Sequence, residues 1–219
     1  MTTMQMAVRS TVGRKVLMAL SGAGILGWLV LHVAGNLLVF RGAEVINGYG
    51  RMLHENPLLL WGQRLAIGTL LLVHVVTAAQ LEGVRRTARP QRYTVVQPST
   101  ESRAARAMRF TGPAVLVIFV YHLMLFTFGN AHPDFVVGDV HHNLTVGLSS
   151  LVPVVAHVML MLLVGWHLFH GGRSLFYSLG LVHPTYEARV TRVVRAGVLA
   201  LVALGMLIPV GLALGVGGS

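Results

Sequence analysis

The stretch VLMALSGAGILGWLVLHVAGNLLVF, residues 16–40, is predominantly apolar and contains no Asp, Glu, Lys or Arg. An α-helix needs about 20 apolar residues to cross a bilayer, so this run predicts a membrane span. It is too long for the core of a signal peptide and lacks a small-residue cleavage site, so we expect a retained first helix. Four further runs, at about 61–81, 110–128, 144–179 and 193–216, are also predominantly apolar, and the second is the weakest because Gln63 and Arg64 lie at its start. The sequence therefore predicts an all-α, five-helix membrane bundle that forms one domain over residues 1–219.

The composition supports a membrane protein and limits its chemistry. Hydrophobic residues make up 54% of the chain and charged residues only 11%, with a mean hydropathy of +0.70. No cysteine is present, which excludes disulfides, thiolate-bound iron–sulfur clusters and cysteine nucleophiles within this chain. A redox centre in this chain must therefore use histidine.

The basic residues predict an orientation. Most of the 17 Lys and Arg residues lie in the N-terminal segment, between residues 82 and 109, and between residues 173 and 195. Lys and Arg favour the cytoplasmic side of a membrane, so the N-terminus is expected inside and the C-terminus outside. This topology accounts for the formal charge of +10 without nucleic acid as a partner, and the multi-pass chain is assigned to the cytoplasmic (inner) membrane.

Eleven histidines in so apolar a chain call for a reason, since ionisable groups inside a membrane are costly. Six of them fall within the predicted spans, and the first four spans each carry at least one. The six are His32, His74, His122, His157, His167 and His170. The fifth span carries none, which predicts four helices around cofactors and a fifth helix packed outside.

Position along each span sorts four of these histidines into two layers. His32 and His122 lie toward the outer ends of their spans, whereas His74 and His167 lie toward the basic, inner ends. A bis-histidine haem takes one imidazole on each face of the porphyrin, and each layer offers two imidazoles from different helices. Zinc, copper or proton-relay sites usually recruit carboxylates or sulfur, and no acidic residue lies within an apolar core.

Three stretches resemble a known family. They are HVAGNLLVFRGAE (32–44), FTGPAVLVIFVYH (110–122) and WHLFHGGRSLFYSLGLVHP (166–184). They resemble the single-chain, di-haem cytochrome b anchor of succinate:quinone oxidoreductases and fumarate reductases, and the likeness covers most of the chain.

The resemblance implies a set of ligands and partners. It assigns His74 and His167 to the iron of the inner haem b, and His32 and His122 to the iron of the outer haem b. It also implies an FAD-containing flavoprotein subunit, an iron–sulfur subunit, and quinone, often menaquinone, as the substrate. The chain would then be one subunit of an enzyme and carry no succinate chemistry itself. Some fumarate-reducing members have a glutamate where this chain has Gly165, so a proton path there is not expected.

Three further residues are candidates for contacts near the haems. His170 is expected one turn beyond His167, at a haem propionate or a quinone. His54 and Glu55 are expected at a quinone site near the outer end of the second span, where a proton-exchanging group is needed. Two other functions stay open: a haem-free anchor that binds quinone and its partners, and a transporter whose histidines bind a metal ion or protons.

Overall fold

The structure is a computed structural model that describes residues 10–88 and 100–217, without the side chains of residues 100–106. Every regular element in these described ranges is a helix. In chain order they are α2 (Thr11–Asn36), the 3-10 helix η1 (Leu37–Arg41), α3 (Ala43–His54), α4 (Pro57–Thr87), α5 (Thr100–Phe126), α6 (Val140–Gly147), α7 (Leu151–Ser178), the 3-10 helix η2 (Pro184–Tyr186) and α8 (Glu187–Ala213).

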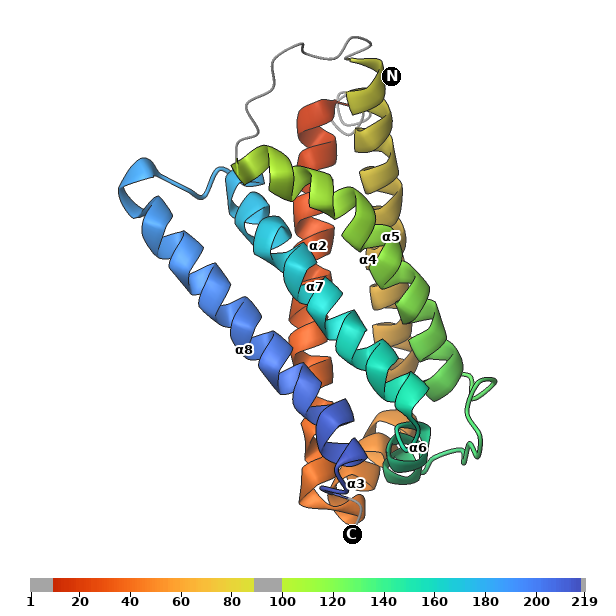
Figure 1. Cartoon of the computed structure of the whole chain (residues 1–219). Coiled ribbons are helices and arrows are strands. Elements are labelled where there is room, and N and C mark those ends of the chain that lie inside the picture. Colours follow the sequence, from red (N-terminus) through yellow and green to blue (C-terminus); the bar gives the residue numbers. More distant parts are fainter. Residues whose placement is uncertain (1–9, 89–99, 218–219) are drawn as a thin grey trace.

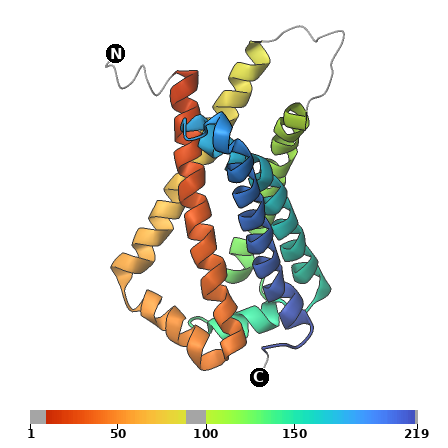
Figure 2. The same cartoon turned by 90° about the vertical axis from the view of Figure 1, so that its left-hand side faces the viewer.

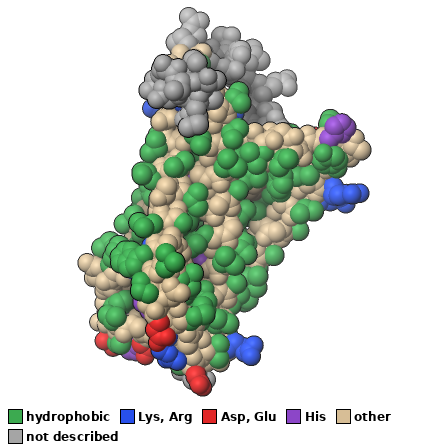
Figure 3. Space-filling model, turned by 180° about the vertical axis from the view of Figure 1, so that it is seen from behind, with side chains coloured by type: hydrophobic (Ala, Val, Ile, Leu, Met, Phe, Trp, Pro, Cys, Tyr) green, Lys and Arg blue, Asp and Glu red, His purple; other side chains and the backbone are tan. Residues whose placement is uncertain are grey.

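Five helices of the described chain are long and apolar enough to cross a membrane. These candidate spans are Thr11–Arg41, Pro57–Thr87, Ala107–Phe126, Leu151–Ser178 and Pro184–Ala213. Apolar side chains cover the length of the bundle, while charged side chains gather toward its ends (Figure 3). The prediction of an all-α protein with five spans is confirmed.

The long helices form a bundle in which α2 and α7 are central (Figures 1 and 2). Helix α2 packs against α4 and α7, and α7 packs in turn against α5 and α8. Helices α2 and α5 are therefore on opposite sides of a four-helix group, as are α4 and α7. The fifth span, α8, lies outside this group, as the distribution of histidines predicted.

Local sequence explains where the helices begin and end. Ser10 starts α2 by accepting a hydrogen bond from the Gly13 N–H at 2.9 Å. Asn56 starts α4 in the same way, accepting from the Leu59 N–H at 3.1 Å, with Pro57 at the first position of the helix. Gly42, at φ 96°, separates η1 from α3 with a backbone that other residues rarely adopt.

The predicted starts of the fourth and fifth spans differ from the structure. The run 144–179 is interrupted, because α6 ends at Gly147 and α7 begins at Leu151. The Ser149 hydroxyl donates to the Val146 carbonyl at 2.8 Å, which helps to satisfy the end of α6, and Ser150 is the N-cap of α7. The fifth helix, expected from about residue 193, already begins at Glu187. Apolar runs locate the membrane core well, but they do not mark where a helix begins or ends.

The second span is longer than predicted. Helix α4 begins at Pro57 rather than near residue 61, because the Asn56 cap lies there. The Arg64 guanidinium lies 5.2 Å from the centroid of the Trp61 ring, and both side chains are exposed. This aromatic contact accommodates the arginine near the end of an otherwise apolar helix.

One end of the bundle is closed by short helices that the hydropathy did not predict. Helices α3 and α6 pack against each other there, beside η1 and the end of α8 (Figure 1). The buried cluster of the molecule lies in this region and consists of Val39, Ile46, Leu144, Leu148 and Ile208. We call this the cap end, and we call the opposite end, where α2 begins, the N-terminal end.

Candidate functional site: two histidine pairs

Four histidines from four different helices form two ring pairs. The ring centroids of His32 on α2 and His122 on α5 are 5.8 Å apart, and we call these two the outer pair. The centroids of His74 on α4 and His167 on α7 are 6.2 Å apart, and these form the inner pair. Each pair joins helices from opposite sides of the four-helix group. The structure thus brings together the same rings that depth along the spans had grouped.

The two pairs lie at different depths. His32 and His122 each lie about one turn before the end of their helix, next to the cap end. Ser21, which contacts His74, lies about three turns before His32 on α2, so the pairs are separated by about 16 Å along that helix. Both pairs therefore fit within a hydrocarbon core of about 30 Å.

The spacing within each pair fits an iron atom between the rings. Two imidazole nitrogens about 2 Å from a metal, on opposite sides of it, place their ring centroids about 6 Å apart. The centroid distances of 5.8 and 6.2 Å match this requirement. Two imidazoles from different helices at one level of the bundle suit haem iron.

Hydroxyl groups orient the inner pair. The Ser21 hydroxyl donates to the Leu17 carbonyl at 2.7 Å, and its oxygen lies 3.3 Å from His74 Nδ1. The Thr111 hydroxyl likewise donates to the Ala107 carbonyl at 3.1 Å and lies 3.4 Å from His167 Nδ1.

These contacts determine which ring nitrogen is available. Each hydroxyl has one hydrogen, and a helix carbonyl already accepts it, so the histidine Nδ1–H is the donor to the hydroxyl oxygen. Nε2 of a neutral ring then carries a free lone pair. A second hydrogen bond of this kind is the usual way in which proteins orient a histidine that binds a metal.

A glycine follows each of these hydroxyl residues and lies beside the histidine ring, with little space for a side chain at Gly22. A Cβ added to Gly22 would lie 3.2 Å from His74 Cε1, and a Cβ on Gly112 would lie 3.8 Å from His167 Cε1. Both dipeptides, Ser21-Gly22 and Thr111-Gly112, lie about three turns before the outer histidine of the same helix. These residues were not predicted from the sequence, although the repeated spacing of a hydroxyl residue and a histidine on one helix face was a detectable signal.

The outer pair has different surroundings. The His32 ring stacks on Trp28, with centroids 4.6 Å apart, and the Asn36 amide lies 3.3 Å from His32 Nε2. His122 Nδ1 lies 3.1 Å from Nε2 of His157, the histidine that our sequence analysis left without a role.

A cationic side chain with one buried, unpartnered N–H lies beyond the inner pair. Arg14 Nε is buried and has no hydrogen-bond partner in the described part of the chain. Arg14 lies about two turns before Ser21, on the same face of α2. The first turn of α2 contains no acidic residue. A carboxylate at this position would satisfy the buried N–H and would also suit the helix N-terminus, and haem propionates are carboxylates.

The three remaining candidates are less constrained. His170 lies on α7, half-buried, about one turn closer to the N-terminal end than His167. His54 Nδ1 donates to the Gly50 carbonyl at 2.8 Å within α3, and Glu55 is exposed at the end of that helix. Neither His54 nor Glu55 forms a hydrogen bond with the outer pair within the described residues.

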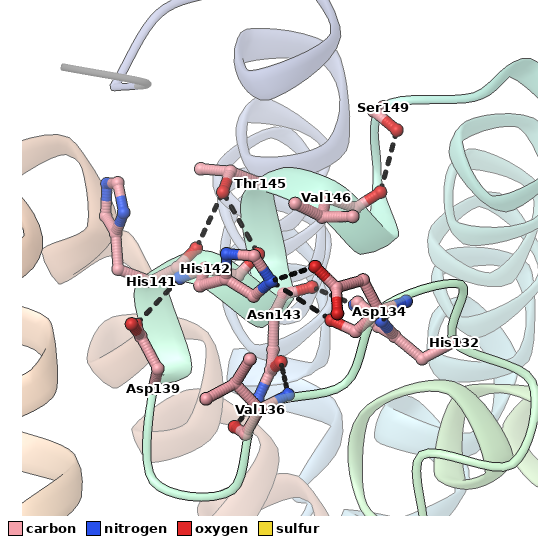
Figure 4. Close-up of polar contacts among 10 residues, drawn as sticks. All are labelled: His132, Asp134, Val136, Asp139, His141, His142, Asn143, Thr145, Val146 and Ser149. Carbon is pink, nitrogen blue, oxygen red and sulfur yellow. Dashed lines mark hydrogen bonds and ion pairs between the residues drawn. The ribbon is translucent and has the colours of Figure 1, made fainter.

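Histidines near α6 have structural partners. The Asp134 N–H donates to His132 Nδ1 at 3.0 Å, so His132 Nε2–H donates to the Asn143 carbonyl at 2.8 Å. His142 Nε2 lies 3.2 Å from the Asp134 carboxylate (Figure 4). His132 is buried. These contacts organise the loop before α6.

Asp139 links α6 to α3. Its carboxylate accepts hydrogen bonds from the His142 N–H at 2.9 Å, as the N-cap of α6, and from the Asn47 side chain at 2.9 Å. These hydrogen bonds lower the pKa of Asp139 below its ordinary value. The hydrogen bond from His142 has the larger effect and the one from Asn47 the smaller. The ionised carboxylate therefore stabilises the cap end.

The fold and the site define a class: a multi-pass helical membrane protein with two layers of facing histidines inside its bundle. No protein-family model matches the chain, and searches among curated proteins and among solved structures also find no match.

Proposed function

We propose that this chain is the membrane anchor of a succinate:quinone oxidoreductase and that it holds two b haems. The proposal is carried by one observation, the two histidine pairs with centroid separations of 5.8 and 6.2 Å on four different helices. In this proposal the N-terminal end faces the cytoplasm. There the chain meets an iron–sulfur subunit, which is joined to an FAD-containing flavoprotein, and quinone, with menaquinone expected, exchanges electrons within the membrane.

The residues of the site have separable tasks in this proposal. Haem supplies one-electron redox chemistry when it is bound. His32, His122, His74 and His167 would hold the two haem irons through ring nitrogens, and the Ser21 and Thr111 hydroxyls keep the inner rings in the tautomer that leaves Nε2 free. Arg14 provides a buried donor for a propionate carboxylate. The apolar helices exclude water from both layers.

The low burial of α4 is also consistent with a bound group. Helix α4 carries His74, yet Thr77 is its one buried residue. A helix with so little burial against its own chain is suited to contacts with a cofactor, a partner or lipid. All three are required by an anchor that binds haem and soluble subunits.

A visible spectrum of the protein purified with its partners tests the proposal. The reduced-minus-oxidised difference should contain two b-type haems with distinct midpoint potentials. His32→Ala should remove one haem and His74→Ala the other, because each variant deletes a ligand from a different pair. Loss of both haems from each variant would contradict the proposal that the two histidine pairs bind haem independently.

Two other outcomes would favour the other functions. Quinone turnover by a complex without haem absorption would identify a haem-free anchor. Histidine-dependent uptake of a metal ion or protons by liposomes, again without haem, would identify a transporter.

A further inference from the structure

His157 is a buried polar residue that the ligand pairs do not use. It lies on α7 with 9% of its surface exposed, at the level of the outer pair. Its ring centroid is 5.3 Å from those of both His122 and Phe126, and 6.4 Å from that of Tyr121. A polar side chain in such surroundings needs hydrogen-bond partners, and both of its ring nitrogens have one.

The partners of His157 determine where its hydrogen lies. Nδ1 is 2.7 Å from the Pro153 carbonyl oxygen. A carbonyl can only accept, so Nδ1 carries the hydrogen and donates it. An uncharged ring has one N–H, and a charged ring at this depth would be costly. Nε2 of His157 is therefore an acceptor.

The same logic extends to His122. Its Nδ1 lies 3.1 Å from His157 Nε2, so the His122 Nδ1–H must be the donor in this contact. Nε2 of His122 is then left with a free lone pair. One backbone carbonyl, at Pro153, thus determines the tautomers of two successive rings.

We propose that His157 is a positioning residue for the outer haem: it holds the His122 ring in the ligating tautomer and increases the electron donation of that ring to iron. This inference rests on the proposed function. A hydrogen bond donated by the far nitrogen makes an imidazole a more basic ligand, which favours the oxidised metal.

The inner pair offers a comparison within the same molecule. Its Nδ1 atoms donate to hydroxyl oxygens at 3.3 and 3.4 Å, whereas His122 donates to an imidazole nitrogen at 3.1 Å. The shorter contact goes to the more basic acceptor, so ligand donation is stronger at the outer pair. His157 therefore lowers the midpoint potential of the outer haem relative to the inner one.

The test is a redox titration of His157→Leu in the complete complex. Leucine fills a similar volume but accepts no hydrogen bond. We expect both haems to remain, with the outer midpoint shifted upward and the inner midpoint unchanged. His157→Gln, whose amide oxygen can accept from His122, should return the outer midpoint toward that of the unmodified protein. Met161→Leu is the matched control, because Met161 is buried one turn further along α7 and contacts Gly205 on α8.

The outcomes separate this inference from the proposed function. Unmodified protein without haem would defeat the proposed function itself. Two haems with potentials that are unchanged in His157→Leu would leave the proposed function standing and overturn the role of His157. Loss of the outer haem from both the leucine and glutamine variants, with Met161→Leu intact, would also overturn it, since His157 would then be a ligand.

Discussion

His167 and His170 lie one turn apart on α7, and only one of them is expected to bind the inner iron. The structure places His167 opposite His74 and gives its Nδ1 a partner in Thr111. We predict that His167→Ala abolishes the inner haem, whereas His170→Ala retains bis-histidine absorption and at most changes the potential or the turnover. Optical and EPR spectra of the two variants are the measurement. An inner haem that survives in the first variant and disappears in the second would show that His170 is the ligand.

Arg14 is the second residue whose environment leads to a prediction. Its buried, unpartnered Nε is expected to donate to a propionate of the inner haem. Arg14→Gln should lower the inner midpoint potential, because removing a nearby positive charge disfavours the extra electron of the reduced iron. Redox titration measures this shift. Lys15→Gln is a suitable control, since the neighbouring Lys15 is exposed on another face of α2. An equal shift of the midpoint potential in both variants would show that general surface charge, and not a contact with a propionate, causes the effect.

Helix α6 is the element whose stability should depend on pH. The pKa of Asp139 is lower in the folded protein than its ordinary value of 3.8. The ionised carboxylate therefore contributes its full stabilisation of the fold at pH values above 3.8. This stabilisation is lost as the pH falls through the lower pKa of the folded state. Asp139→Ala removes the N-cap and the link to Asn47, and should cost about 1–2 kcal/mol near neutral pH. Thermal unfolding in detergent, followed by circular dichroism, measures the loss.

Asp139→Asn separates the cap from its charge. Asparagine retains an acceptor for the His142 N–H but does not titrate. The variant should therefore stay close to the unmodified protein at neutral pH and show less dependence on acid. A dependence on pH identical to that of the unmodified protein would show that other carboxylates are responsible.

The charge distribution of the whole molecule predicts a docking face at the N-terminal end. Glu82 lies 2.7 Å from Arg85, 3.0 Å from Arg86 and 3.9 Å from Arg109. One carboxylate cannot neutralise three guanidinium groups, so this surface remains positive. In the proposed complex it would suit an acidic surface of the iron–sulfur subunit, or anionic lipid headgroups. Arg89 lies outside the described residues, and the side chains of Arg103 and Arg106 are not described.

Charge reversal tests this docking face. Arg85→Glu, Arg86→Glu and Arg109→Glu together should release the soluble subunits from detergent extracts, and added salt should increase the release because exposed ion pairs are screened. Arg41→Glu with Arg51→Glu, at the cap end, is the control and should leave the complex intact. Unchanged co-purification of the triple variant would favour a role for these arginines in membrane topology alone.

The sequence by itself determined the class of fold and the two levels of histidines. Hydropathy is a local property, so apolar runs located five helices, and the rise of a helix converts residue number into depth. The same local reasoning missed α3 and α6, because their formation depends on caps and on packing against each other. It also left His157 unassigned, although it had identified the residue as buried.

Only the tertiary structure decided which side chains form hydrogen bonds with the ring of each histidine. Ser21 and His74 belong to different helices, as do Thr111 and His167, and His122 and His157. Which side chains meet across a bundle depends on the rotation and crossing of helices, and apolar residues that face lipid and those that face a neighbour look alike in a sequence. Depth could therefore place a ring at its level in the membrane, but the neighbour that orients it had to come from packing.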